Sequence, residues 1–220
     1  SSDRFFPVRI AGYDAKRNMF VNALCYDRKS DHIYIGTEGA LIDLDCASGI
    51  SRRIAEFPGN SVKAIALDHT GAMIVGTDNG MYTIDRDGIR QYRHTVSSPM
   101  SLSNNRVWAI AVDRSNNVWA GTDYNISVAY RDSDYKSIPV SAITERDEGN
   151  RIYSIFRSSD GDLWLGGDHG IIRYKSDGKA DWYMPGDESH PLSHSRVRDI
   201  FEDGADNLWI ATDGGINRFN

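Results

Sequence analysis

The stretch LSHSRVRDIFEDGADNLWIATDGGINRF, residues 192–219, decides the fold. It opens with a short apolar run, passes through a polar turn into LWIAT, and reaches a third apolar run after the doublet GG. Short runs of β-branched and aromatic residues that are separated by Gly, Asp and Asn are typical of strands joined by tight turns. The stretch therefore predicts three consecutive antiparallel strands.

The same pattern recurs four times upstream at nearly constant spacing. A small residue in the second strand aligns the five units; it stands at Gly36, Gly76, Gly121, Gly166 and Ala211. The first step is 40 residues, and each of the next three is 45. Units of this length that consist of four short strands predict a β-propeller, in which the small residue lets a neighbouring strand approach closely.

We therefore expect an all-β chain of five four-stranded blades. The predicted blades span residues 20–60, 61–104, 105–149, 150–194 and 195–220. The last unit lacks a fourth strand, and residues 1–19 are expected to contain an outer strand, because FFPVRIAG (5–12) parallels KSIPVSAI (136–143). This strand either completes the last blade and closes a five-bladed ring, or belongs to a missing blade of a larger ring. We favour the second alternative, in which the chain is a fragment of a larger propeller.

Composition narrows the classes of function. The net charge of −6 argues against binding to nucleic acid, and no run of 18 apolar residues is present to span a membrane. Cys25 and Cys46 are too few for a disulfide framework and are predicted to lie several strand spacings apart in one blade, so we expect two free thiols. The sequence indicates no cofactor.

Charged residues recur in register and suggest a binding site. Arg106, Arg151 and Arg196 precede the innermost strand of three consecutive units. An acid follows the second strand in all five units, at Glu38, Asp78, Asp123, Asp168 and Asp213. Both positions are predicted on one face near the propeller axis, where the arginines would hold an anionic ligand such as a uronic or sulfated sugar. In the alternative interpretation, each arginine pairs with an acid of its own or a neighbouring blade.

Aromatic residues near that face are further candidates, because sugars stack on rings. Trp108 and Tyr153 share one position in the inner strand, and Tyr124 and His169 share one in the turn after the second strand. The recurring tryptophans at 119, 164 and 209 are predicted to form the core between blades. We find no positioned carboxylate pair, nucleophile elbow or metal-binding histidine pair, and predict no catalytic and no metal-binding residues.

The stretch 192–219 resembles the two-component regulator propeller repeat, and LSNNRVWAIAVDRSNNVWAGTD (102–123) matches it nearly as well. The first two units are more degraded, with Tyr34 and Ile74 in place of tryptophan. The resemblance implies the periplasmic sensor region of a hybrid two-component histidine kinase of Bacteroides-type bacteria, which detects an oligosaccharide from glycan breakdown. The partners implied are that oligosaccharide, further blades and a following domain of the receptor, and a second copy in a homodimer.

Two other classes of function stay open. One is a protein-interaction scaffold of the WD-repeat kind. The other is a metal-dependent enzyme, since virginiamycin B lyase is a propeller with similar blades. An enzyme of that kind would need an unrepeated His/Glu cluster at the mouth of the propeller, which the sequence does not display.

Overall fold

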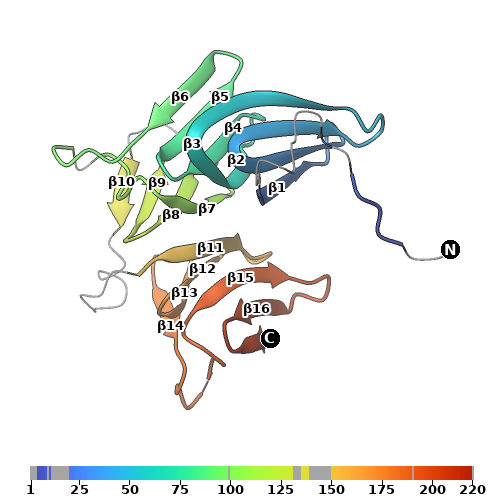
Figure 1. Cartoon of the computed structure of the whole chain (residues 1–220). Helices are drawn as coiled ribbons and strands as arrows, with labels where there is room; N and C mark the ends of the chain where they lie inside the picture. Colours follow the sequence, from blue (N-terminus) through green and yellow to red (C-terminus); the bar gives the residue numbers. More distant parts are fainter. Residues whose placement is uncertain are drawn as a thin grey trace.

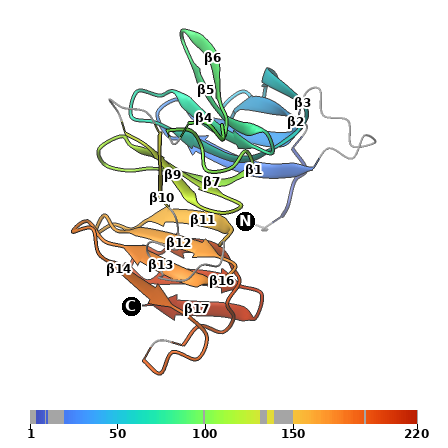
Figure 2. The ribbon, with the colours of Figure 1, turned by 90° about the vertical axis from the view of Figure 1, so that its left-hand side faces the viewer.

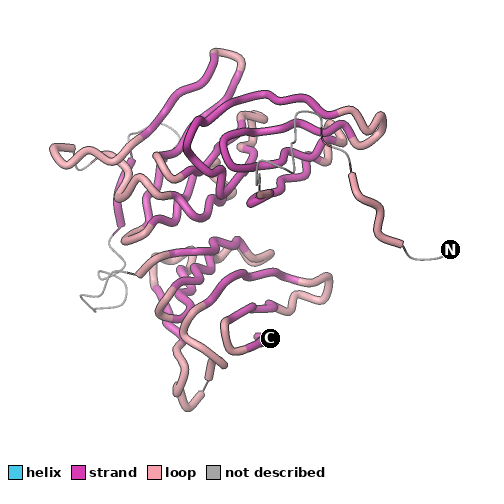
Figure 3. The backbone as a smooth tube through the Cα atoms, in the orientation of Figure 1, coloured by secondary structure: helices cyan, strands magenta, loops and turns pink. Residues whose placement is uncertain are grey.

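The computed structural model describes residues 4–8, 10, 20–98, 100–130, 135–138, 150–189 and 191–219. Every regular element in these ranges is a β-strand, as the strand colouring of Figure 3 shows. The predicted all-β class is confirmed for this part of the chain. Within the same ranges, no helix exists that is long and apolar enough to cross a membrane.

The strands of the described residues form four antiparallel sheets (Figure 1). The first, with six strands, contains β1 (Val21–Asp27), β2 (His32–Asp45), β3 (Ser51–Leu67), β4 (Met73–Thr77), β5 (Gly80–Asp85) and β6 (Gly88–Tyr92). The second contains β7 (Val107–Val112), β8 (Val118–Thr122), β9 (Ile126–Ala129) and β10 (Tyr135–Ile138). The third contains β11 (Ile152–Arg157), β12 (Leu163–Gly167), β13 (Gly170–Tyr174) and β14 (Ala180–Tyr183). The fourth contains β15 (Val197–Glu202), β16 (Leu208–Thr212) and β17 (Gly215–Phe219).

The first two predicted blades are joined through β3, so five separate four-stranded sheets are not confirmed in the described ranges. The start of β3 pairs with β2, from Leu44↔Ser51 to Ala40↔Glu56, and its end pairs with β4, from Val62↔Thr77 to Leu67↔Met73. One strand thus serves as the outer strand of the first repeat and the inner strand of the second. The cause is the shorter first step of the repeat, which leaves no long loop between these two strands.

The sheets follow one another in chain order around a common centre (Figures 1 and 2). Their inner strands are neighbours in the order β1, the end of β3, β7, β11 and β15. Within the described ranges, no comparable contact joins β15 back to β1, so the sheets form an open, propeller-like arc and not a closed ring. Residues 4–8 belong to no strand, and the outer strand expected within residues 1–19 stays a prediction.

A repeated close contact holds consecutive repeats together. Each glycine of the second strand faces the β-branched residue that opens the next inner strand. A Cβ at Gly36, Gly76, Gly121 or Gly166 would lie only 2.5 to 2.8 Å from a γ-carbon of Val62, Val107, Ile152 or Val197, respectively. This is closer than carbon atoms can pack, so the glycines are required by packing, as predicted.

The recurring tryptophans lie between sheets in two of three cases. Trp119 and Trp164 are buried in apolar clusters with the next sheet, which confirms the prediction for both. Trp209 is 40% exposed, against 2% for Trp164, and the prediction is wrong for this residue. The physical reason is that no described sheet packs on that side of β16.

The turn between the first and second strands is built around one acidic side chain. The Asp113 carboxylate accepts hydrogen bonds from the backbone N–H groups of Ser115 and Asn117, both at 2.9 Å, and from the Trp119 indole at 2.9 Å. Asp203 repeats the arrangement and accepts from Trp209 at 2.8 Å. These bonds fix the start of the second strand. Cys25, on β1, and Cys46, in the turn after β2, are free thiols, as predicted.

Candidate functional site

The turn after the second strand places an acid at the same point in each repeat. A threonine hydroxyl closes the turn in four repeats by donating to the carbonyl oxygen three residues later, at 2.8 to 3.0 Å; the threonines are Thr37, Thr77, Thr122 and Thr212. The next residue is the predicted acid. In the last two repeats the backbone N–H of this acid donates to the carbonyl oxygen of the arginine that precedes the inner strand, from Asp168 to Arg151 and from Asp213 to Arg196, both at 3.1 Å. Acids and arginines therefore share one face, as predicted.

The three predicted arginines bridge neighbouring repeats. Arg106 Nε lies 3.2 Å from Asp78 Oδ1, and its Nη1 lies 3.4 Å from Asp123 Oδ2. Arg196 repeats this geometry between Asp168, at 2.9 Å, and Asp213, at 3.4 Å. This geometry matches the alternative interpretation, in which each arginine pairs with an acid of its own or a neighbouring repeat.

Arg151 joins the same series through a tyrosine. Its Nε lies 2.7 Å from Asp123 Oδ1, and its Nη1 donates to the Tyr153 hydroxyl at 3.1 Å. That hydroxyl donates in turn to Asp168 Oδ1 at 3.1 Å. The hydrogen bond with Tyr153, followed by the bond and charge of Asp123, raises the pKa of Arg151, so the guanidinium stays charged.

A second row of side chains runs beside the arginines, one residue into the inner strands. Lys63 Nζ lies 4.5 Å from the centroid of the Trp108 ring, and Trp108 and Tyr153 meet edge to face with centroids 5.6 Å apart. The Arg198 guanidinium carbon is 5.3 Å from the centroid of Tyr153. The row therefore places a cation at either end of a pair of rings across four consecutive repeats, and each cation gains from the negative face of a ring.

Lys63 and Arg198 were missed by sequence reasoning, although both contact the predicted residues. Lys63 Nζ is 3.3 Å from Asp78 Oδ1. Arg198 donates two hydrogen bonds to the Asp213 carboxylate, from Nε at 2.6 Å and from Nη2 at 3.1 Å. The Arg198 guanidinium holds the pKa of Asp213 below its usual value. Their position in the repeat could have indicated them, because both residues align with Trp108 and Tyr153.

Together these residues form what we call the charged ladder. Positive and negative side chains alternate along it, in the order Lys63, Asp78, Arg106, Asp123, Arg151, Asp168, Arg196, Asp213 and Arg198. The side chains of the three predicted arginines remain 39% to 47% exposed. The ladder is therefore internally paired and still open to solvent.

The predicted aromatic residues differ in their exposure and in their contacts with the rest of the protein. The Trp108 indole donates to Asp123 Oδ1 at 2.7 Å while Lys63 lies over its ring, so this ring is engaged by the protein. Tyr124 is exposed in the turn after β8. His169 is partly buried, and its carbonyl oxygen accepts from the Trp182 indole at 2.7 Å.

Asn150 is a further polar residue that sequence reasoning missed. It is 2% exposed, lies directly before Arg151, and its Oδ1 accepts from the backbone N–H of His169 at 3.1 Å. Its Nδ2 has no acceptor in the described part of the chain. A buried amide donor without a partner beside the ladder can donate a hydrogen bond to a ligand oxygen or a water molecule.

The residues that the structure describes contain no group of three or more metal-ligating side chains.

Repeated antiparallel units around a common centre, with one charged face, define the chain as a propeller-like repeat protein. The two component regulator propeller model matches residues 101–124, 146–169 and 191–214. These three stretches are therefore two-component regulator propeller repeats, and the resemblance found in the sequence is confirmed over them. A comparison with curated proteins gave no match.

Solved structures point in the same direction. An extracellular domain of B. thetaiotaomicron, described as part of a putative hybrid two component system, is 40% identical with a TM-score of 0.54; the alignment covers 97% of this chain and 30% of that one. Another B. thetaiotaomicron domain of the same description is 16% identical with a TM-score of 0.51, covering 90% and 39%. Virginiamycin B lyase from Staphylococcus aureus is 15% identical with a TM-score of 0.68, covering 91% and 69%. The last two show the fold alone, and the chain spans less than a third of the relative that is 40% identical.

Proposed function

We propose that the chain is part of the ligand-sensing region of an extracytoplasmic, periplasmic sensor of a hybrid two-component histidine kinase. In this proposal it recognises a glycan-derived oligosaccharide and passes the signal to a kinase outside this chain. The regulator propeller repeats and the 40% identity to an extracellular domain of a hybrid two-component system support the sensor assignment. The role is one of binding and not of catalysis.

The observation that carries the ligand proposal is the half-exposed state of Arg106, Arg151 and Arg196. A guanidinium that is half-exposed can exchange or share its acids with a carboxylate or sulfate of a sugar, through two parallel hydrogen bonds. Tyr124, exposed in the turn after β8, offers stacking, and the buried Asn150 amide directly before Arg151 offers hydrogen bonding. An acidic oligosaccharide is the ligand class that uses all three.

The same geometry suggests how ligand binding would change the contacts between neighbouring sheets. Arg151 directly precedes β11 and pairs with Asp123, which follows β8 in the preceding sheet. A ligand that takes over this guanidinium weakens an ion pair between two sheets. Sheet-to-sheet ion pairs are thus the contacts that binding would change.

The proposal is tested by calorimetry of the chain against acidic and neutral oligosaccharides. The double variant Arg106→Ala, Arg151→Ala is expected to lose affinity for the acidic ligand by about a hundredfold or more, because each charge-assisted hydrogen bond contributes roughly 1.5–3 kcal/mol. Arg90→Ala is the matched control, since Arg90 pairs with Asp85 at the outer strands β5 and β6. Unchanged binding by the double variant, with circular dichroism confirming the fold, would contradict the proposal.

A further inference from the structure

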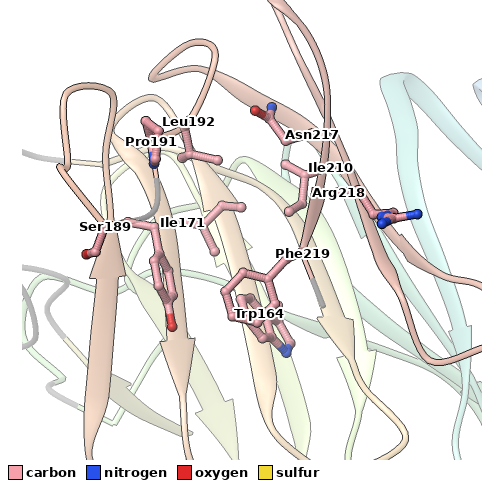
Figure 4. A pocket seen from close by; sticks show the side chains of 10 residues that line it. Trp164, Ile171, Ser189, Pro191, Leu192, Ile210, Asn217, Arg218 and Phe219 are labelled. Carbon is pink, nitrogen blue, oxygen red and sulfur yellow. The ribbon is translucent and has the colours of Figure 1, made fainter.

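At two boundaries between repeats, a pair of aromatic rings fills the space near the start of the second strand. Trp119 of β8 meets Tyr174 of β13 with ring centroids 5.8 Å apart. One boundary further on, Trp164 of β12 meets Phe219 of β17 at 5.1 Å, and Figure 4 shows these two rings together. Each pair joins one sheet to the next through an aromatic contact.

The boundary between the second and third repeats lacks both rings. Ile74 of β4 has the place of the tryptophan, and Ala129 of β9 has the register position of the second ring. A hollow of about 610 Å³ lies there and is lined by both residues, whereas the corresponding hollow beside Trp119 and Tyr174 has about 380 Å³. The space between the sheets is thus larger where the two rings are missing.

The turn beside this hollow still carries the aspartate that binds an indole elsewhere. Asp113 and Asp203 each accept a hydrogen bond from the tryptophan six residues later, at 2.9 and 2.8 Å. Asp68 has the same place, lines the hollow, and accepts from the backbone N–H groups of Thr70 and Ala72 at 2.8 and 2.9 Å. All five indoles of the chain donate to other acceptors. The acceptor has therefore kept its place, and its indole is missing.

A wall for a flat ring is retained as well. Tyr92 of β6 lines the hollow and lies opposite Met81. Tyr183 has the same register position two repeats later, and its ring stacks on Trp164 with centroids 5.9 Å apart and an angle of 17° between the planes. A planar ligand in the hollow would find the same kind of partner in Tyr92.

The rim of the hollow carries a cation that no described acid neutralises. Arg90 and Arg93 both line the hollow. Arg90 is held by Asp85 at 2.8 Å, whereas Arg93 is exposed and forms no ion pair with an acid in the described part of the chain. The hollow thus offers a hydrogen-bond acceptor in Asp68 and a positive charge in Arg93, which together orient a ligand that has a donor and an anionic group.

We propose that this hollow binds a small planar aromatic acid of the indole-carboxylate class. The ring system takes the place of the missing pair of rings against Tyr92, its ring N–H donates to Asp68, and its carboxylate faces Arg93. Apolar cavities between packed elements do take up aromatic molecules that fit them. The site lies near the start of β4, whereas Asp78 of the charged ladder follows the end of that strand. It is therefore separate from the ladder and does not rest on the proposed function.

Calorimetry and thermal denaturation of the whole chain with indole-3-acetate test the proposal. The wild type is expected to bind and to gain Tm as the ligand concentration rises. Ile74→Trp and Ala129→Phe each fill the hollow with a ring that other repeats carry, from opposite sheets, and each is expected to abolish binding. Ile89→Trp is the control, because Ile89 is exposed on β6 and does not line the hollow.

Circular dichroism checks the fold of each variant, and either filled variant that folds decides the question. A wild type that does not bind indole-3-acetate, or binding that persists in a folded filled variant, would overturn the proposal.

Two analogues test the hydrogen bond to Asp68 and the charge of Arg93. Naphthalene-1-acetate lacks the ring N–H and should bind about tenfold more weakly than indole-3-acetate, because a hydrogen bond to a charged group is lost. Arg93→Gln should weaken indole-3-acetate about two- to fivefold, as expected for an exposed ion pair, and leave the neutral indole-3-acetamide unchanged. Arg86→Gln is the control, since Arg86 is exposed in the turn between β5 and β6.

Equal affinities for indole-3-acetate and naphthalene-1-acetate would refute the donor assigned to the ligand. Equal effects of Arg93→Gln and Arg86→Gln on indole-3-acetate would refute its carboxylate contact. Either result would overturn the ligand class proposed for this hollow.

Discussion

At the scale of single residues, the second-strand glycine and the β-branched residue of the next repeat form one recurring contact. The γ-carbon of each Val or Ile occupies the space that a glycine Cβ would need. The fifth repeat carries Ala211 at this position, and no described sheet packs on that side.

Gly121→Ala is expected to lower the free energy of unfolding by about 1–3 kcal/mol, because its Cβ would lie 2.7 Å from Ile152 Cγ2 and 3.0 Å from the Ile152 carbonyl oxygen. Urea denaturation followed by fluorescence measures the change. Gly204→Ala is the control, since nothing lies within 4 Å of the position that its Cβ would take; it should shift stability by less than about 0.5 kcal/mol. Equal stabilities for the two variants would contradict the packing argument.

At the scale of elements, the turns before β8 and β16 each depend on an ionised aspartate. Burial alone would raise the pKa of Asp113, but hydrogen bonds from Trp119 and Asn117 outweigh it and lower the pKa. In Asp203 the Trp209 indole and the backbone N–H groups of Ala205 and Asn207 lower the pKa strongly. Both carboxylates therefore favour the folded state when charged.

The sign of the pH dependence follows from these lowered values. The stabilising contribution is complete above the unfolded-state pKa of an aspartate, near 3.9, and is lost as the pH falls through the lower folded-state pKa. We expect the Tm of the wild type to fall below about pH 4. Asp113→Asn should lower the Tm at pH 7 and flatten this acid limb, whereas the exposed Asp87→Asn should change neither. A Tm of Asp113→Asn that matches the wild type at pH 7 would refute the assignment.

Repeat register predicted most elements, because the strands, turns and glycines recur at fixed positions. It predicted the arginines and acids of the ladder for the same reason. It did not predict Lys63 and Arg198, because these cations occupy the repeat position that Trp108 and Tyr153 occupy in the other two repeats, and the side chains differ in chemistry. The sequence pattern also did not predict the continuous strand β3. A shortened connection removes a loop without altering the strand pattern on either side. Pairing between repeats depends on three-dimensional distances that no single repeat contains.

At the scale of the whole molecule, the arc has two open ends of different composition. The first sheet exposes Leu24 and Tyr26 on β1, and the last exposes Phe201, Trp209 and Ile216. Internal faces of the same kind are covered by the next sheet. The open faces are therefore core-type surfaces that contact solvent in the single chain.

Acrylamide quenching of tryptophan fluorescence tests this arrangement in dilute solution. The wild type should contain a readily quenched component that disappears in Trp209→Phe and persists in Trp164→Phe, because Trp209 is partly exposed and Trp164 is buried. Loss of the accessible component in Trp164→Phe instead would contradict the described packing.

The contact between a glycine and the β-branched residue of the next repeat has a consequence for how such chains change in number. It is the same at four successive boundaries, where the earlier repeat offers the glycine and the later repeat the β-branched residue. Duplication or deletion of a whole repeat by recombination joins halves that already match. Repeat arrays of this kind can therefore lengthen or shorten in a single genetic step, without any compensating substitution at the new boundary.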